Sequence, residues 1–195
     1  RPLVLLCDIS GSMDRYSRLL VMFAHVLQRG LSDVEIFVFG TRLTRITRLL
    51  RTHRPDQAIQ RVADTVVDWS SGTRIGDSIH SFNRKWGRRI MSHGATVMIA
   101  SDGWDRGDTH LLATEMQYLQ RLSFRLIWLN PLLGQRGYEP LTLGMQAALP
   151  YVDDFLPVHN LASLEQLADF LPTVLRTLAS RQRPNSTASN LPYGR

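Results

Sequence analysis

Five oxygen-bearing side chains fall in three short segments whose chemistry suits a hard metal ion. Asp8, Ser10 and Ser12 occupy alternate positions of Asp-Ile-Ser-Gly-Ser. Thr73 stands in Ser-Gly-Thr, and Asp102 stands in Ser-Asp-Gly. Carboxylates and hydroxyls bind Mg²⁺, Mn²⁺ or Ca²⁺, whereas softer metals prefer thiolates and imidazoles. The residue types therefore predict a divalent-cation site, with Mg²⁺ as the expected ion and Mn²⁺ or Ca²⁺ as alternatives.

The segments around these residues predict how they come together. Short apolar runs alternate with helical patterns, which is typical of an α/β fold with a doubly wound, mostly parallel sheet and helices on both faces. Residues 3–8 read as a buried central strand that ends at the first aspartate. In such sheets, ligands lie beyond the carboxyl ends of the strands. We therefore expect the three polar segments to meet at one edge of the sheet.

The remaining elements follow from apolar runs, caps and breakers. We expect strands at residues 3–8, 34–39, 43–49, 95–100, 124–129 and 154–158, with 43–49 as one antiparallel edge strand. We expect helices at 13–29, 55–67, 75–88, 109–121, 141–149 and 161–178, the first ended by Gly30 as a C-cap. Residues 1–180 are expected to form one domain, and 181–195 a polar, disordered tail. The chain starts within the approach to its first strand, so we expect it to be a piece of a longer protein.

The predicted ligand set is short of negative charge and of ligands for an octahedral ion. At least one coordination position is therefore expected to stay open to water or an anion, and Asp102 is expected to act either directly or through water. Two helix N-termini point at the same place, which favours an anion there. Each segment alone is more simply an N-cap or a turn than a metal ligand. Their coincidence at three strand ends favours a receptor for a carboxylate.

This five-position pattern resembles the metal-ion-dependent adhesion site (MIDAS) of von Willebrand factor type A (VWA) domains, and the resemblance spans residues 3–178. Three further stretches are similar to the CoxE-like subfamily, at residues 37–45, 101–107 and 128–132. The resemblance implies a Rossmann-like fold and a soluble bacterial accessory protein without enzymatic activity. It also implies work with a MoxR-type AAA+ ATPase in the maturation of a metalloenzyme, which for CoxE is carbon monoxide dehydrogenase. A partner's acidic side chain would then bind at the metal.

Further residues near the predicted site are candidates for partner contact. Trp104, Asp105 and Arg106 follow Asp102 directly, and we interpret the tryptophan either as a partner contact or as packing over the site. An arginine recurs at every third position from Arg42 through Arg45 to residue 54. This series fits charge that guards an edge strand against mispairing, or a docking surface for an acidic partner.

Composition narrows the functional classes. The chain of 195 residues has no apolar run near the ~20 residues that a membrane-spanning helix needs. The lone Cys7 excludes an intramolecular disulfide and fits a reducing cytoplasm. The net charge of +6 is almost wholly arginine.

Two rival functions stay open at this point. A metal-dependent hydrolase would use the same ion with Asp102 and Asp105 as general base and orienting group, but no phosphate-binding Gly-x-x-x-x-Gly-Lys loop or Gly-x-Ser-x-Gly elbow occurs. Binding of nucleic acid through arginine is the weaker alternative, because aromatic residues are not interleaved.

Overall fold

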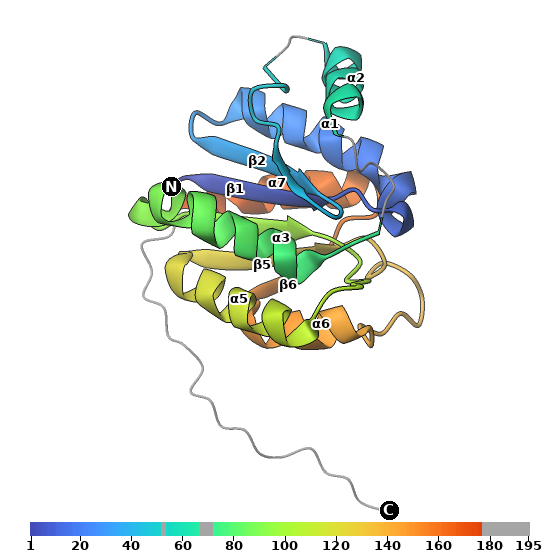
Figure 1. Cartoon of the computed structure of the whole chain (residues 1–195). Coiled ribbons are helices and arrows are strands. Elements are labelled where there is room, and N and C mark those ends of the chain that lie inside the picture. The colour runs from blue at the N-terminus through green and yellow to red at the C-terminus, as the bar shows by residue number, and fades with distance from the viewer. Residues whose placement is uncertain (52–53, 67–71, 177–195) are drawn as a thin grey trace, which may run out of the picture.

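The computed structural model describes residues 1–51, 54–66 and 72–176 and forms a six-stranded sheet between two layers of helices (Figure 1). The strand order is β3-β2-β1-β4-β5-β6, and all neighbours are parallel except β2 and β3. The strands are β1 (Leu3–Asp8), β2 (Val34–Phe39), β3 (Leu43–Arg45), β4 (Thr96–Ala100), β5 (Arg125–Asn130) and β6 (Asp154–Pro157). The predicted fold class, with its antiparallel edge strand, is confirmed.

The helices divide between the two faces of the sheet. They are α1 (Asp14–Gly30), α2 (Pro55–Thr65), α3 (Ile75–Phe82), α4 (Arg88–Ile90), α5 (Thr109–Leu122), α6 (Leu143–Ala148) and α7 (Leu161–Arg176). Apolar side chains of α1, α2 and α7 form one core cluster, and those of α3, α5 and α6 form the other. Figure 1 shows α3, α5 and α6 together on one side of the sheet. Within the described residues, no helix is both long and apolar enough to cross a membrane.

The central strand β1 explains why this sheet needs helices on both faces. Leu3, Leu5 and Cys7 pack into one core cluster, whereas Val4 and Leu6 pack into the other. Successive side chains of a strand point to opposite faces, so a strand without a polar position must be covered on both sides. The unbroken apolar run thus fixes β1 in the middle of the sheet, with its aspartate at the carboxyl end.

Several predicted element boundaries differ from the structure. The helix expected at residues 75–88 contains a π-helical turn at Asn83–Gly87 and continues through α4. Gly30 is the last residue of α1, and Leu31 is the C-cap, so the predicted glycine cap is wrong. Among the glycines that the structure describes, those with a positive φ angle are Gly94, Gly103 and Gly137. The predicted tail at 181–195 and the predicted helix ends at Val67 and Leu178 lie outside the described residues.

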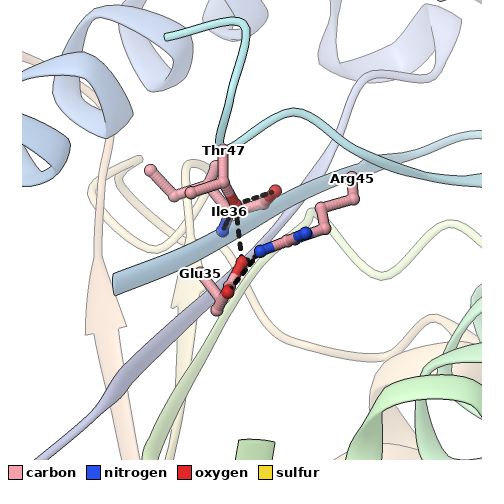
Figure 2. Close-up of polar contacts among 4 residues, drawn as sticks. All are labelled: Glu35, Ile36, Arg45 and Thr47. Atoms are coloured by element: carbon pink, nitrogen blue, oxygen red, sulfur yellow. Dashed lines mark hydrogen bonds and ion pairs between the residues drawn. The ribbon is translucent and has the colours of Figure 1, made fainter. Parts of the chain in front are cut away.

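The edge strand β3 is shorter than predicted because the chain turns away from β2 after Ile46, whose backbone N–H still donates to the Ile36 carbonyl at 2.9 Å, and a side chain then takes the place of the backbone. The Thr47 hydroxyl accepts a hydrogen bond from the Ile36 backbone N–H at 2.9 Å and donates to the Glu35 carboxylate at 2.8 Å. Arg45 donates through Nε to the same carboxylate at 2.7 Å, and a second guanidinium nitrogen also bonds to it (Figure 2). The Arg45 guanidinium lies over the Trp86 ring. These contacts favour the edge-guarding interpretation for Arg45.

The same contacts determine the ionisation of Glu35. Burial by itself raises the pKa of Glu35, but hydrogen bonds from Arg45 and Thr47 and the Arg45 charge outweigh burial and hold that pKa below its usual value. A carboxylate with a lowered pKa in the folded state stabilises the fold above its unfolded pKa of about 4.3 and loses this contribution as pH falls through the folded value.

Arg45→Met should therefore destabilise the domain at neutral pH, by roughly 1–3 kcal/mol, because hydrogen bonds to a charged, half-buried group are lost. The loss should shrink as pH falls through the lowered folded pKa of Glu35, since this carboxyl is then protonated in both proteins. Chemical unfolding at two pH values measures both effects. Arg48→Met is the matched control, because Arg48 is exposed. Equal losses for the two variants would refute this role of Arg45.

Candidate metal centre

The strand ends bring the three predicted polar segments to one edge of the sheet. Asp8 is the last residue of β1, and the register Cys7↔Ala100 places the ends of β1 and β4 side by side. Asp102 follows β4 by two residues. The Arg74 backbone N–H donates to the Gly40 carbonyl at 3.0 Å, which ties the segment containing Thr73 to the end of β2. The parallel sheet thus places all three segments at its carboxyl edge, as the sequence predicts.

Asp8 is fully buried, and each of its carboxylate oxygens accepts a hydrogen bond. The Ser10 backbone N–H donates to Oδ1 at 2.9 Å, and the Ser101 hydroxyl donates to Oδ2 at 2.6 Å. The Ser10 side chain also bonds to this carboxylate. A carboxylate offers about four lone-pair directions, so the bonds from the described residues leave acceptor capacity. Asp8 is therefore held in position without being saturated by the part of the chain that the structure describes.

Hydroxyl groups complete the candidate centre. Ser10 Oγ lies 3.3 Å from Ser12 Oγ. The Asp102 carboxylate accepts hydrogen bonds from the Trp104 backbone N–H at 3.0 Å and from the Ser12 side chain. A surface pocket of about 390 Å³ opens here, and its lining contains Ser10, Gly11, Ser12, Gly72, Thr73, Trp104, Asp105 and Arg106. The five predicted ligands are thus linked to one another directly or through this pocket.

The electrostatics of the centre favour a positive charge. Burial raises the pKa of Asp8 to about 7; hydrogen bonds from Ser10 and Ser101 oppose this rise, and the Asp102 charge adds to it. Burial also raises the pKa of Asp102, against hydrogen bonds from Trp104 and Ser12. Two buried carboxyl groups that disfavour each other's charge are stabilised in their ionised form by a nearby cation.

The donor set fits a hard divalent cation. Its members are two carboxylates and three hydroxyls, the oxygen donors that Mg²⁺ and Ca²⁺ take in proteins. In the part of the chain that the structure describes, no group of three or more His, Cys, Asp or Glu side chains is placed to hold a metal. A centre at this edge must therefore rely on hydroxyl ligands, and these disfavour soft metals.

The loop after β4 is held in place by contacts that the sequence does not reveal. Gly103 has a φ of 79°, a left-handed conformation that glycine adopts without strain. Its N–H donates to the Ser101 hydroxyl at 3.0 Å, and its carbonyl accepts from the Thr142 hydroxyl at 3.0 Å. A Cβ on Gly144 would lie only 2.4 Å from the Gly103 carbonyl oxygen. The start of α6 thus packs directly on the loop that carries Asp102.

The predicted partner contacts at this loop have different environments. Trp104 is 61% exposed beside the pocket. Asp105 Oδ1 accepts from the backbone N–H groups of Ile75 and Gly107, each at 3.0 Å, so this side chain secures the start of α3. The Arg106 backbone N–H donates to the Thr73 carbonyl at 3.0 Å. The exposed side chain of Arg106 lies over Gly72.

The two arginines of the edge-strand series lie in different places. Arg42 is exposed in the turn between β2 and β3, where its carbonyl accepts from the Gly40 N–H. Arg45 is bonded to Glu35 and is not part of the pocket lining. The structure thus places Arg42, and not Arg45, toward the metal-centre edge. Cys7 is a buried core thiol, and burial raises its pKa.

The sequence interpretation overlooked two residues that support the centre. Ser101 is fully buried and joins Asp8 to Gly103 through its hydroxyl. Its position ahead of Asp102 in Ser-Asp-Gly, at the end of a buried strand, is a signal that could have indicated this role. Thr142 caps α6 by accepting from the Met145 N–H, and it also donates to Gly103. Only the packing of α6 on the loop reveals this second bond.

Known structures share this architecture at low sequence identity. An aerotolerance-related membrane protein from Bacteroides fragilis is 13% identical, with a TM-score of 0.56 over 90% of this chain and 99% of that one. A von Willebrand factor type A protein from Catenulispora acidiphila is 19% identical, with a TM-score of 0.59 over 89% of this chain and 42% of that one. Proximal thread matrix protein 1 from the mussel byssus, with a zinc-occupied MIDAS motif, is 14% identical, with a TM-score of 0.57 over 89% and 47%.

Sequence comparison identifies the family. No curated protein sequence matches the chain. The family model described as "VWA domain containing CoxE-like protein" matches residues 1–164, which is most of the chain. This match agrees with the six-stranded sheet and with the polar segments gathered at its carboxyl edge. The chain therefore belongs to the CoxE-like family of VWA domains.

Proposed function

We propose that this chain is a metal-dependent protein-interaction domain in which a bound divalent cation bridges it to an acidic side chain of a partner. The ligands would be Asp8, Ser10, Ser12, Thr73 and Asp102. The observation that carries the proposal is the buried carboxylate of Asp8, which lies beside hydroxyl groups that line a surface pocket. Hydrogen bonds from the described residues leave part of the acceptor capacity of this carboxylate unused. A buried carboxylate needs a compensating charge, and the pocket gives an external anion access to the same place.

Each residue of the centre has a definable task. Asp8 supplies the principal negative charge, and Ser10 and Ser12 supply neutral oxygen donors. Thr73 adds a hydroxyl from the segment before α3, and Asp102 adds a carboxylate directly or through water. A bound cation would supply an electrophilic position for a carboxylate oxygen of the partner. With Asp102 bound through water, Asp8 would be the only charged ligand in direct contact with the cation, and the metal would keep net positive charge that attracts the partner's anion.

Mg²⁺ is the ion that we propose, with Mn²⁺ or Ca²⁺ as alternatives. The oxygen-only donor set supports all three. The mussel byssus protein with a zinc-occupied MIDAS motif supports occupation of such a centre by a divalent ion. The abundance of Mg²⁺ relative to other divalent ions in cells decides our choice among them.

Membership of the CoxE-like family supports a more specific role. We propose that the domain works in the cytoplasm with a MoxR-type AAA+ ATPase, and that together they assist maturation or cofactor assembly of a metalloenzyme such as carbon monoxide dehydrogenase. The acidic side chain bound at the centre would belong to one of these partners. A single, buried cysteine is compatible with a reducing compartment.

We propose binding rather than catalysis at this centre. A hydrolase would need a base beside the metal that is available to accept a proton. Asp105, one of the two candidates for that chemistry, has Oδ1 engaged by two backbone N–H groups. Asp102 accepts bonds from Trp104 and Ser12 and belongs to the candidate ligand set. Both carboxylates thus have structural tasks that account for their positions.

Asp8→Asn should remove high-affinity metal binding while preserving the fold, because it deletes the buried charge but keeps the side-chain shape. We expect Mg²⁺ affinity to fall by more than ~100-fold, beyond the effect typical of outer-shell residues. Isothermal calorimetry with Mg²⁺ and Mn²⁺ measures the change. Asp33→Asn is the matched control, because Asp33 is exposed and precedes β2 at the opposite end of the strands. Absence of heat for the parent chain at millimolar metal would refute the proposed centre.

Metal affinity should rise with pH and level off above about 7, the pKa to which burial raises Asp8. Below that value, the cation must displace a proton from Asp8. The stability of the metal-free protein should change with pH in the opposite direction. Because the pKa of Asp8 is raised in the folded state, the contribution of Asp8 to stability is complete below the unfolded pKa of about 3.9 and is lost as pH rises through the folded pKa. Calorimetry from pH 5.5 to 8.5 tests the metal affinity, and thermal unfolding in chelator tests the stability of the metal-free protein.

The Asp8→Asn variant supplies the control for both the calorimetry and the thermal unfolding. Titrating groups remote from Asp8 contribute equally to the parent and the variant, so the difference between their pH profiles isolates Asp8 together with its coupling to Asp102. A pH-independent metal affinity, or identical unfolding profiles for the two proteins, would contradict this assignment.

Binding of the MoxR-type ATPase should depend on Asp8 more than on exposed acidic residues elsewhere. The purified ATPase itself needs Mg²⁺, so the sharp comparison is between variants at constant Mg²⁺ and not between buffers with and without chelator. We expect immobilised parent chain and Asp33→Asn to capture the ATPase alike, and Asp8→Asn to bind at least ten times more weakly. Equal capture by all three proteins would show that the centre does not mediate this contact.

A further inference from the structure

Apolar side chains lie next to the candidate metal centre on the side of α6. Thr142 donates to the Gly103 carbonyl, and Gly144 packs against Gly103 and Asp105. The backbone at the start of α6 therefore lies against the loop whose middle residue is Trp104. Leu141 and Leu143 flank Thr142 in the sequence, so their backbones stand next to these contacts, and both side chains are exposed. We call Trp104, Leu141 and Leu143 the apolar ridge.

The residues of the ridge are unusually exposed. Trp104 is 61% exposed, Leu141 is 65% exposed, and Leu143 is 70% exposed. The other large apolar side chains that are exposed in the described part of the chain are Met22, Val26, Tyr118 and Leu161, and they lie on α1, α5 and α7. Single exposed apolar residues are ordinary, but a group of them beside a polar pocket marks a place where another molecule packs.

Positive charge lies at the same edge of the domain as the ridge. Arg74 and Arg106 are exposed, and their backbones are bonded to Gly40 and to Thr73. Arg106 and Trp104 both line the pocket, and Arg42 is exposed in the turn after Gly40. The Asp102 and Asp105 carboxylates accept backbone hydrogen bonds within their own loop. This edge of the domain therefore presents exposed arginines as well as exposed apolar side chains.

We propose that the apolar ridge is a second contact surface for the partner that binds at the metal centre, and that the partner offers an acidic, amphipathic segment. One carboxylate of the segment would bind at the centre, and apolar side chains next to it would pack on the ridge. The arginines make an acidic segment the complementary occupant. This inference rests on the proposed function, because it places the partner's carboxylate at the metal.

The closeness of the two surfaces limits the spacing in the partner. Trp104 itself lines the pocket that contains Ser10 and Ser12. An extended chain advances about 3.3 Å per residue, so the apolar side chains should stand within roughly two to four residues of the carboxylate. The exposed Trp104 also suits a contact of the kind that dominates binding energy in protein interfaces.

Synthetic peptides of defined sequence test this proposal without an identified partner. Four dodecapeptides on a Gly-Ser background would carry a central Glu with Leu two and four residues after it, Glu with Ser at those two positions, Gln with Leu there, or Gln with Ser there. Each is titrated into the ¹⁵N-labelled chain with Mg²⁺, and dissociation constants are taken from the chemical shifts. We expect the Glu-Leu peptide to bind at least five times more tightly than the Glu-Ser and Gln-Leu peptides.

Variants of the chain then locate the apolar contact. Leu143→Ser should abolish the advantage of the Glu-Leu peptide over the Glu-Ser peptide while leaving Mg²⁺ affinity unchanged. Val26→Ser is the matched control, because Val26 is 63% exposed on α1, and it should preserve that advantage. Thermal unfolding of both variants checks their folds, and Trp104→Ser gives a second variant of the ridge.

The outcomes separate this inference from the proposed function. Equal binding of the Glu-Leu and Glu-Ser peptides, with normal Mg²⁺ affinity, overturns the ridge and leaves the metal centre standing. Binding of the Leu peptides regardless of Glu, or ridge-dependent self-association of the chain in sedimentation, assigns the ridge to another occupant and overturns the shared partner. Failure of the parent chain to bind Mg²⁺ overturns the proposed function, and this inference falls with it.

Discussion

The burial of one carboxylate at the end of the central strand is the constraint on which the rest of this domain depends. Asp8 follows an apolar strand that is covered on both faces, so its position is fixed by the core and not by the loop that follows it. A buried carboxylate is costly unless it is hydrogen-bonded or compensated by charge. Ser10 and Ser101 supply hydrogen bonds, and the raised pKa indicates that they do not compensate fully. A cation would complete the compensation.

The surrounding loops can be understood as supports for this carboxylate. Ser101 joins the end of β4 to Asp8, and the same hydroxyl holds Gly103 in its left-handed conformation. Asp105 holds the start of α3, and the Arg106 backbone holds Thr73. Because α6 packs directly on the loop, the residues at its start become neighbours of the centre. The candidate metal centre and the exposed apolar side chains next to it thus depend on one set of contacts.

Much of this arrangement could be predicted from the sequence. The unbroken apolar run of β1 and the oxygen donors after it predicted both the parallel sheet and the edge where the donors gather. The length of β3 was less predictable, because Thr47 replaces backbone pairing with its side chain and no periodicity shows this. The π-helical turn at Asn83–Gly87 and the contact of Gly144 with Gly103 depend on tertiary packing. Arg42 and Arg45 belong to one regular arginine series, and the sequence does not show that they have different roles. Only the structure shows that Arg45 pairs with Glu35.

The most direct test of a cation bound at Asp8 is anomalous diffraction from crystals of the chain grown or soaked with Mn²⁺. We predict one strong anomalous peak at the carboxyl edge of the sheet, with Asp8, Ser10 and Ser12 among its ligands and Thr73 and Asp102 bound directly or through water. A peak at this position also shows whether a coordination site faces the pocket. Crystals with Mn²⁺ bound elsewhere, or with none at this edge at millimolar concentration, would contradict the account.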